Sequence, residues 1–89
     1  MNLSPLTNPA TFGEACRRRR KILGLTLQDA AGAAGVNYRF ASELERGKET
    51  CVLGKSLKYA QMLGVELYYA PNGDASPQLP VSVADRSER

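Results

Sequence analysis

The 89-residue sequence has no histidine and only two cysteines, Cys16 and Cys51, which are far apart. Without histidine the chain lacks the usual general base of nucleophilic catalysis. Two separated cysteines do not supply the ligands that a zinc site needs, nor the disulfide framework of a small secreted protein. An enzyme is therefore the class of protein that the sequence favours least, and we expect no metal and no cofactor.

Long apolar runs are also missing. No stretch is long enough to span a membrane, and the first residues contain no signal-peptide core. We therefore expect a cytoplasmic protein of bacterial type with no membrane partner. The length allows one small domain and not two. Because so small a core is marginally stable, association with a second copy would stabilise it.

The charge that is present is unevenly distributed. The formal net charge is +3 and the pI is about 9.1. Residues 1–70 contain ten Lys and Arg against six Asp and Glu, whereas residues 71–89 contain two against three. The positive charge therefore lies in the part that should fold, as expected of a domain that meets phosphate there.

Capping signals and glycines predict two helices in residues 11–35. In the first, Thr11 and Glu14 fit a capping box, and a glycine ends the helix. Its apolar stripe comprises Phe12, Ala15, Cys16 and Leu23. The second helix begins with another capping box, formed by Thr26 and Asp29, and is rich in alanine. Such small side chains let a neighbouring helix approach closely.

Two further helices are expected in residues 37–63. Asn37 is a good N-cap for a helix that runs to about Arg46 and ends before Gly47. Its inward positions are Ala41 and Leu44. The fourth helix covers about residues 53–63. Its predicted core positions are Leu53, Leu57, Ala60 and Leu63.

Residues 65–70 are rich in β-formers and partly alternate, which predicts a strand. Nothing else in the sequence looks like a strand that could pair with it, and an apolar strand edge is a liability unless another chain covers it. Residues 71–89, with three prolines and few large apolar residues, are expected to be disordered. Residues 1–10 should form a flexible arm, which leaves 11–64 as the folded domain.

The clearest functional signal lies in residues 26–47. A short helix, a turn centred on Gly35 and a second helix follow one another there. A glycine in the turn supports the left-handed backbone that lets two helices cross steeply. Polar residues at the start of the second helix can then enter the major groove of DNA while its apolar face stays on the core. This pattern predicts a helix-turn-helix DNA-binding domain.

These residues, which close with the sequence SELERG at 42–47, resemble the Cro/repressor-type (XRE) helix-turn-helix family. A longer set of matches resembles the antitoxins of the HipB type, and it comprises RFASELERGK at 39–48, LGK at 53–55 and LGVEL at 63–67. The resemblance implies an all-α domain of four to five helices with a short C-terminal strand that pairs across a homodimer. The residues that would make this dimer contact are Val65, Leu67, Tyr68 and Tyr69.

The same resemblance implies a function. Such a dimer binds palindromic operators in double-stranded DNA, including its own promoter, and restrains a kinase-like toxin of the HipA type. Two alternatives to an antitoxin stay open. One is a solitary helix-turn-helix regulator without a toxin, and the other is a protein-interaction module that does not bind DNA.

Matching the family position by position implies two sets of DNA contacts. Bases or the groove would be met by Asn37, Tyr38, Arg39, Ser42 and Glu43. Phosphates would be met by Thr26, Gln28, Arg46 and Lys48. Arg17, in the basic run of the first helix, is a further candidate for a phosphate contact. Arg39 suits a bidentate contact to guanine, and Asn37 suits a contact to adenine or to a phosphate. Glu43 could accept a hydrogen bond from cytosine or be merely solvated. One departure is Leu27, which stands where the family often has a glutamine that contacts phosphate.

Other residues favour structural roles. The basic run at 17–21 covers more than one helical turn, so it cannot all face DNA. Within it, Arg20 matches a position that commonly pairs with a glutamate, here Glu45, inside the fold. Tyr38 suits groove contact and plain exposure equally, whereas Phe40 favours packing over contact with a thymine methyl. Cys16 is expected in the core.

Overall fold

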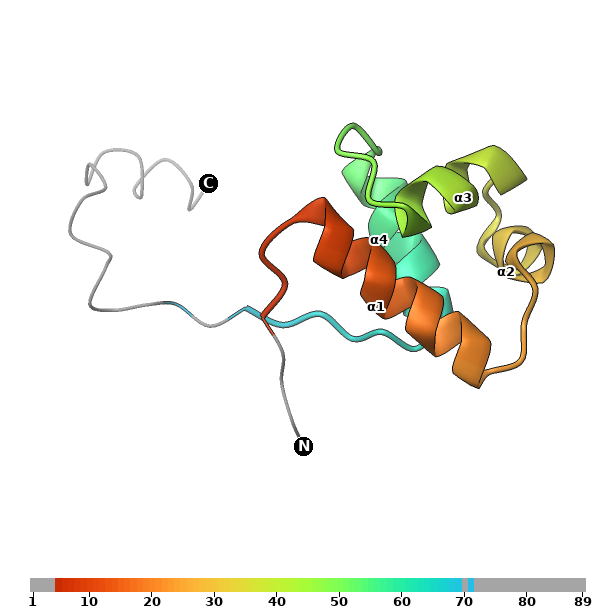
Figure 1. Ribbon diagram of the computed structural model, residues 1–89, viewed down its shortest axis with the longest axis horizontal. Helices are drawn as coiled ribbons and strands as arrows, with labels where there is room; N and C mark the ends of the chain where they lie inside the picture. The colour runs from red at the N-terminus through yellow and green to blue at the C-terminus, as the bar shows by residue number, and fades with distance from the viewer. Residues whose placement is uncertain (1–4, 70, 72–89) are drawn as a thin grey trace, which may run out of the picture.

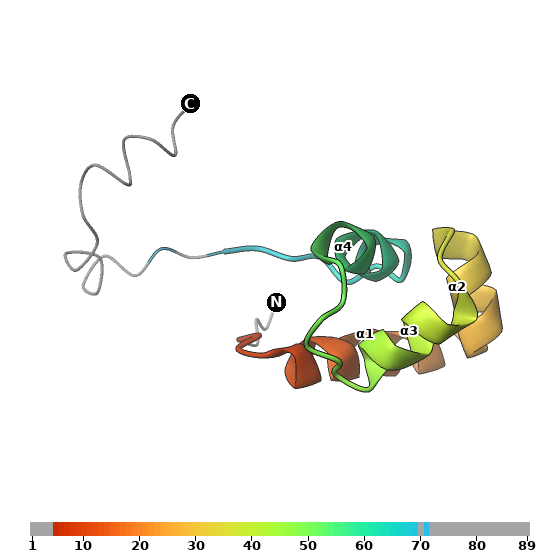
Figure 2. The ribbon, with the colours of Figure 1, turned by 90° about the horizontal axis from the view of Figure 1, so that it is seen from above.

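The computed structural model describes residues 5–69 and 71, and four helices lie in this part of the chain. They are α1 (Pro9–Ile22), α2 (Leu27–Ala34), α3 (Tyr38–Glu45) and α4 (Leu53–Met62) (Figure 1). Helix α3 packs against both α1 and α2, and α2 also packs against α4. Seen from above, α1 and α3 lie on one side, α4 on the other, and α2 at one end (Figure 2). The predicted all-α architecture is confirmed.

Helix α1 begins two residues before Thr11, where the capping box was predicted. Asn8 is the N-cap, since its side-chain oxygen accepts a hydrogen bond of 2.9 Å from the Thr11 amide. The Thr11 hydroxyl in turn accepts from the Asn8 amide at 3.4 Å. Pro9 occupies the first helical position, where its missing N–H costs nothing. The predicted box was therefore wrong in register, and Glu14 instead faces Arg18 at 3.7 Å.

The caps predicted for α2 and α3 are confirmed. The Thr26 hydroxyl accepts from the Asp29 amide at 3.0 Å, and the Asp29 carboxylate accepts from the Thr26 amide at 3.4 Å. The side-chain oxygen of Asn37 accepts from the Phe40 amide at 2.7 Å. Between the two helices Gly35 has a φ of 74°, the left-handed conformation that the turn requires. The steep helix crossing thus follows from local hydrogen bonds and one glycine.

The core is built from small side chains, with one large aromatic. Its fully buried residues are Cys16, Ala30, Ala31, Ala34, Ala41, Leu44, Tyr59, Ala60 and Leu63. Helices α1 and α3 approach so closely that a Cβ on Gly13 would lie 2.3 Å from the Leu44 carbonyl oxygen. Leu23 was wrongly assigned to this core. It follows the end of α1, where helical spacing no longer applies, and is 43% exposed.

The inward face of α4 also differs from the prediction. Leu53 and Leu57 are 70% and 43% exposed, whereas Ser56 and Tyr59 are buried beside Ala60. The two leucines line a surface groove of about 510 Å³ instead. The register of α4 is explained by Tyr59, whose hydroxyl reaches a buried carboxylate from α3. A polar contact from another helix therefore decides which face of α4 turns inwards.

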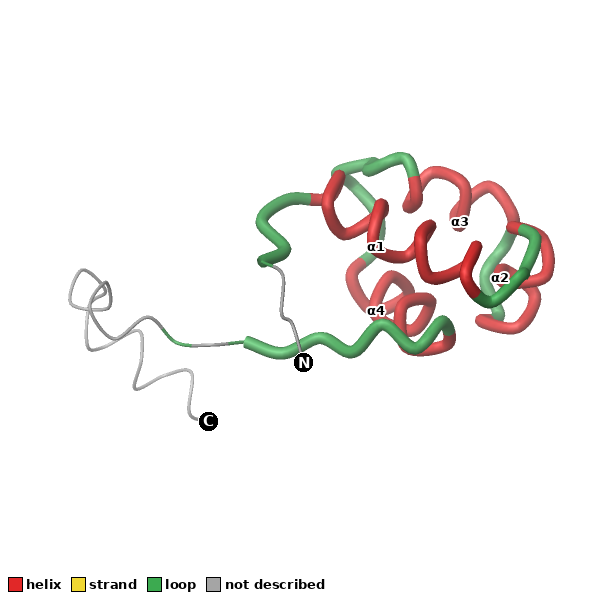
Figure 3. Tube along the Cα trace, turned by 60° about the horizontal axis from the view of Figure 1, so that its bottom comes forward, coloured by secondary structure: helices red, strands yellow, loops and turns green. Residues whose placement is uncertain are grey.

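Residues 65–69 form neither helix nor strand within the described chain (Figure 3). The Val65 amide donates to the Ala60 carbonyl at 2.9 Å, and the chain then continues with Leu67, Tyr68 and Tyr69 exposed. The predicted strand was expected to form only by pairing with a second copy of the chain, which a single chain does not test, so the strand stays a prediction. Its last residue, position 70, lies outside the described residues, as do 1–4 of the predicted arm and 72–89 of the predicted tail. Among the helices of the described residues, none combines the length and apolarity needed to cross a bilayer.

Candidate nucleic-acid interface

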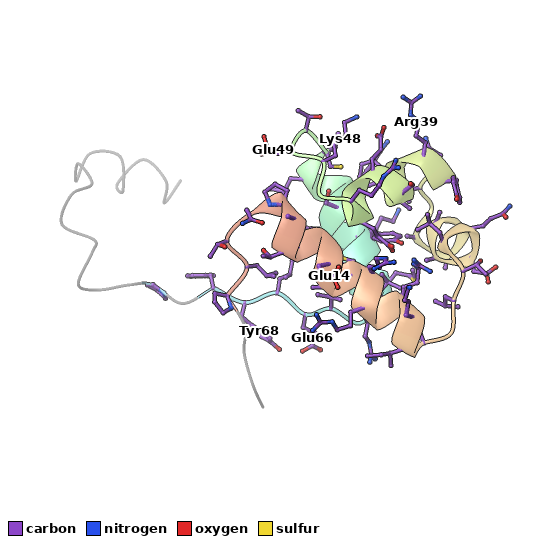
Figure 4. The ribbon with its side chains drawn as sticks, viewed as in Figure 1. Glu14, Arg39, Lys48, Glu49, Glu66 and Tyr68 are labelled. Atoms are coloured by element: carbon purple, nitrogen blue, oxygen red, sulfur yellow. The ribbon has the colours of Figure 1, made fainter. Side chains whose placement is uncertain are left out.

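The exposed surface of α3 carries the five residues predicted to meet bases or the groove. Asn37, Tyr38 and Arg39 are exposed at its start, and Ser42 and Glu43 are half-buried one turn later. Arg39 points away from the rest of the molecule (Figure 4). Because α3 turns its buried residues towards α1 and α2, this polar face is free to enter a groove.

The fold already uses one of the two hydrogen-bonding groups of the Asn37 side chain. Its side-chain oxygen already accepts the N-cap hydrogen bond from Phe40. A bidentate contact to adenine needs both the oxygen and the amide N–H₂ of asparagine. Since the oxygen is engaged, the free donor suits a phosphate better, which favours the second of the two roles predicted for Asn37.

Glu43 links two cations. Its Oε2 accepts from Arg39 Nε at 3.2 Å, and its Oε1 accepts from Lys48 Nζ at 3.0 Å. These hydrogen bonds, that of Lys48 first, hold the pKa of the Glu43 carboxyl below its ordinary value. The carboxylate is therefore charged and has partners on both oxygens. A merely solvated charge does not describe this arrangement, and the cytosine contact stays a prediction.

Two of the predicted phosphate contacts come together in a groove of about 400 Å³. Arg17 from α1 and Arg46 after α3 both line it, together with Leu27 at the start of α2. The free amides and dipole at the start of a helix attract an anion. Exposed Thr26 and Gln28 flank this helix start. The groove therefore combines the guanidinium groups of Arg17 and Arg46 with the positive end of α2. The rest of its lining is the carboxylate of Glu14, Ser42 and the paired Arg20 and Glu45.

Lys48 lies apart from this groove. It lines the apolar groove beside α4 and is held by Glu43. The predicted phosphate contacts thus divide into a group around the start of α2 and a single lysine after α3. Exposed Tyr68 lines the same apolar groove. Arg39, in contrast, lies on the opposite side of the molecule from Tyr68 and Glu66 (Figure 4). The predicted dimer segment therefore leaves the exposed start of α3 uncovered.

A buried polar network supports α3 from behind. Arg20 and Glu45 form the predicted ion pair, with Nε donating to Oε2 at 2.9 Å and Nη2 to Oε1 at 3.0 Å. Arg20 Nη1 also donates to the Leu25 carbonyl at 2.9 Å. The side chains of the pair are 13% and 4% exposed. The network ties the end of α3 to α1 and to the loop before α2.

The third member of the network, Tyr59, was missed from the sequence. Its hydroxyl donates to Glu45 Oε2 at 2.6 Å. Burial, followed by this hydrogen bond, raises the pKa of Tyr59 well above its ordinary range. The hydrogen bond to Glu45 likewise raises the pKa of Arg20. Among the described residues, no buried side-chain nitrogen or oxygen atom lacks a hydrogen-bond partner.

Two further residues that position α3 were missed. Gly13 allows the close approach of α1, and its signal in the sequence is a glycine inside a helical pattern, which costs about 1 kcal/mol relative to alanine. Lys55 of α4 lies with its Nζ 5.9 Å from the centre of the Phe40 ring, a cation–π contact. Phe40 is half-buried against the core, which favours its predicted packing role.

Neither cysteine has the chemistry of a reactive thiol. Cys16 is fully buried in the core, as predicted, and its pKa is raised to about 12 by burial and then by the charge of Glu45. Burial also raises the pKa of half-buried Cys51. Reactive cysteines need a lowered pKa. Within the described chain, no group of three His, Cys, Asp or Glu residues could hold a metal ion.

Among solved structures, the HipA-HipB-O2-O3 complex contains a chain that this protein matches with a TM-score of 0.71 at 19% identity. The match covers 78% of this chain and 97% of that one. A chain of the HipB-O4 20mer complex matches with a TM-score of 0.70 at 19% identity, over the same shares. At such low identity these likenesses show the fold alone.

Sequence comparison goes further. No protein-family model matches the chain. The HTH-type transcriptional regulator y4mF of Sinorhizobium fredii, however, is 40% identical over 62 residues, which cover 70% of this chain and 82% of that protein. Together with the helix-turn-helix geometry of α2 and α3, this identity shows that the chain belongs to the HTH-type transcriptional regulators.

Proposed function

We propose that the protein is a dimeric, sequence-specific repressor that binds a palindromic operator in double-stranded DNA. The observation that carries the proposal is the α2–Gly35–α3 unit, which exposes Arg39 at the start of α3 while Glu45 at its end is held in a buried network. A rigidly supported helix with exposed polar residues at its start is the element that reads a major groove.

In this mechanism affinity and specificity come from different residues. The groove lined by Arg17 and Arg46, with the start of α2, binds the phosphate backbone and sets the position of the domain. Arg39 then reaches a base edge, where a bidentate contact to guanine discriminates by about 1–3 kcal/mol. The protein acts by occupying its site, without catalysis, in the cytoplasm where bacterial DNA is found.

The dimer sets the spacing of the site. Val65, Leu67, Tyr68 and Tyr69 would pair with the same residues of a second copy and cover their exposed apolar surface. Two α3 helices related by twofold symmetry read half-sites about 34 Å apart, one turn of DNA. Because the predicted dimer segment and Arg39 lie on opposite sides of the molecule, dimerisation leaves both α3 helices free.

The operon that the protein regulates is proposed to encode a toxin as well. The fold matches nearly the whole length of the HipB chain in a complex that also contains HipA. By this likeness, the chain is the antitoxin of a HipA-type kinase-like toxin and represses the operon that encodes both. Co-expression with the neighbouring gene product and affinity purification tests this part, since an antitoxin retains the toxin and a solitary regulator does not.

DNA binding is tested by footprinting the purified protein on the DNA upstream of its own gene at two salt concentrations. We expect paired protected sites about one turn apart that weaken as salt rises. Arg39→Ala should lower affinity for that DNA by about 1–3 kcal/mol. Arg18→Ala is the matched control, because it removes one exposed positive charge from α1, outside the groove of Arg17 and Arg46. Equal losses in the two variants would contradict a base contact by Arg39.

A further inference from the structure

We infer that Glu43 is a positioning residue that holds Arg39 and Lys48 in place for DNA and thereby sets the sequence specificity of the protein. The inference rests on the proposed function, because it assumes that Arg39 meets a base. It assigns to Glu43 a role through its two neighbours and no contact of its own with DNA.

The geometry gives each cation its own oxygen. Glu43 lies one helical turn after Arg39 on α3, and the Arg39 Nε donates to Oε2. Lys48 Nζ donates to the other oxygen, Oε1. The Glu43 side chain is 21% exposed, whereas that of Arg39 is 86% exposed. The largely buried Glu43 carboxylate therefore holds Arg39 at its Nε, while the end of the arginine side chain projects into solvent.

The atoms that Glu43 uses are not those needed for a base contact. Only Nε of Arg39 is engaged, which leaves the N–H groups of both terminal nitrogens free. A guanidinium can thus donate to guanine with its end while its Nε is held from the side. The side chain loses rotamer freedom before it meets DNA, so less entropy is lost on binding.

Lys48 is fixed to Glu43 twice. Besides the side-chain contact, the Lys48 amide donates to the Glu43 carbonyl at 3.0 Å. The intervening Gly47 has a φ of 86°, and its backbone lies against Ala10 of α1. A residue with a Cβ would be strained in this tight turn. Glu43 therefore joins the recognition helix and the following loop into one unit.

The charge of Glu43 gives the role a recognisable signature. A carboxylate close to DNA repels phosphate, so it weakens binding to every sequence. Only a DNA sequence that forms the base contact with the positioned Arg39 offsets this loss of affinity. Removing the carboxylate should therefore tighten binding to unrelated DNA and reduce discrimination, which is the pattern of a group that acts against wrong partners.

The test uses two DNA duplexes of equal length and composition. One is selected by the full-length wild-type protein from random duplexes, and the other is the same sequence scrambled. Glu43→Gln should lower the ratio of the two affinities by about fivefold to tenfold, within what one guanine contact supplies. Glu49→Gln is the matched control. It removes the same charge from an exposed residue next to Lys48 that makes no ion pair within the described chain, and its ratio should stay within about twofold of wild type.

Glu43→Asp separates position from charge. It keeps the carboxylate but shortens the side chain, so the contacts of 3.2 and 3.0 Å are lost while the net charge is unchanged. The affinity ratio should fall as in Glu43→Gln, with binding to the scrambled duplex as in wild type. A ratio equal to wild type in Glu43→Asp would mean that only charge matters, and it would overturn the inference.

Two further readouts identify the cause. In an Arg39→Ala background, Glu43→Gln should not change the affinity ratio further. In the free protein, the Arg39 Nε–H resonance should exchange faster with water in Glu43→Gln than in wild type or Glu49→Gln. Equal exchange in all three proteins would overturn the inference. So would a drop in the affinity ratio caused by Glu43→Gln in the Arg39→Ala background that is as large as in the wild-type background. Equal binding of wild type to both duplexes would instead contradict the proposed function, and the inference with it.

Discussion

Tyr59 on α4 donates a hydrogen bond of 2.6 Å to Glu45 at the end of α3, where Arg20 from α1 holds the same carboxylate. Three helices thus meet at one buried acidic group. A buried carboxylate is tolerated only when its oxygens have donors. The contact therefore links the stability of the domain to the orientation of the helix proposed to read DNA.

Tyr59→Phe should destabilise the protein by about 1.5–3 kcal/mol, the range for a hydrogen bond to a charged group. The fold should survive, since Arg20 still holds Glu45. Urea unfolding followed by circular dichroism measures the change. Tyr68→Phe is the control, because it removes a hydroxyl that also bonds to a glutamate at 2.6 Å, but at an exposed site. An equal effect of the two variants would show that burial of the Tyr59 contact is unimportant.

Gly13→Ala should destabilise the protein although alanine is the better helix former. Its Cβ would lie 2.3 Å from the Leu44 carbonyl oxygen and 2.8 Å from that of Glu45, so α1 and α3 must separate. We expect a loss of about 1–3 kcal/mol, as for overpacking in a core. The matched variant is Gly32→Ala in α2, where no atom lies within 4 Å of the added Cβ. It should stabilise by about 0.5–1 kcal/mol, and opposite signs in urea unfolding are the expected result.

Stability should fall at alkaline pH because of Cys16. Its pKa is raised in the folded protein from 9.0 to about 12, so the thiol ionises more easily in the unfolded chain. This contribution is complete below pH 9 and is lost as the pH rises towards 12. Unfolding in urea at pH 8 and pH 10 should differ by about 1 kcal/mol from this group. Cys16→Ala should reduce the difference, and an unchanged difference would assign it to other groups, Tyr59 first.

Leu67→Lys should weaken the proposed dimer. A charge in the apolar segment at 65–69 would be buried between two chains, so we expect the dimer dissociation constant to rise at least about tenfold. Sedimentation equilibrium measures it. Leu23→Lys is the control. Leu23 is 43% exposed and Leu67 is 40% exposed, but Leu23 lies at the end of α1, outside the proposed dimer segment. A dimer that is weakened equally by both variants would place the interface elsewhere.

The sequence alone determined the features that depend on neighbours three or four residues away. The caps at Thr26 and Asn37 and the left-handed turn at Gly35 are such features. They set the limits of α2 and α3, and therefore the helix-turn-helix. The same local logic favoured Thr11 over Asn8 for α1, where two capping residues competed and Pro9 decided between them.

The tertiary structure decided whatever depends on groups far away in the sequence. Leu57 and Tyr59 are both apolar enough for a core, and only the carboxylate of Glu45 selects the face with Tyr59. Glu43 could equally have faced a base or water until the turn at Gly47 brought Lys48 back to it. Hydrogen bonds between distant segments have no periodicity in the sequence, so these pairings become visible only once the helices are packed.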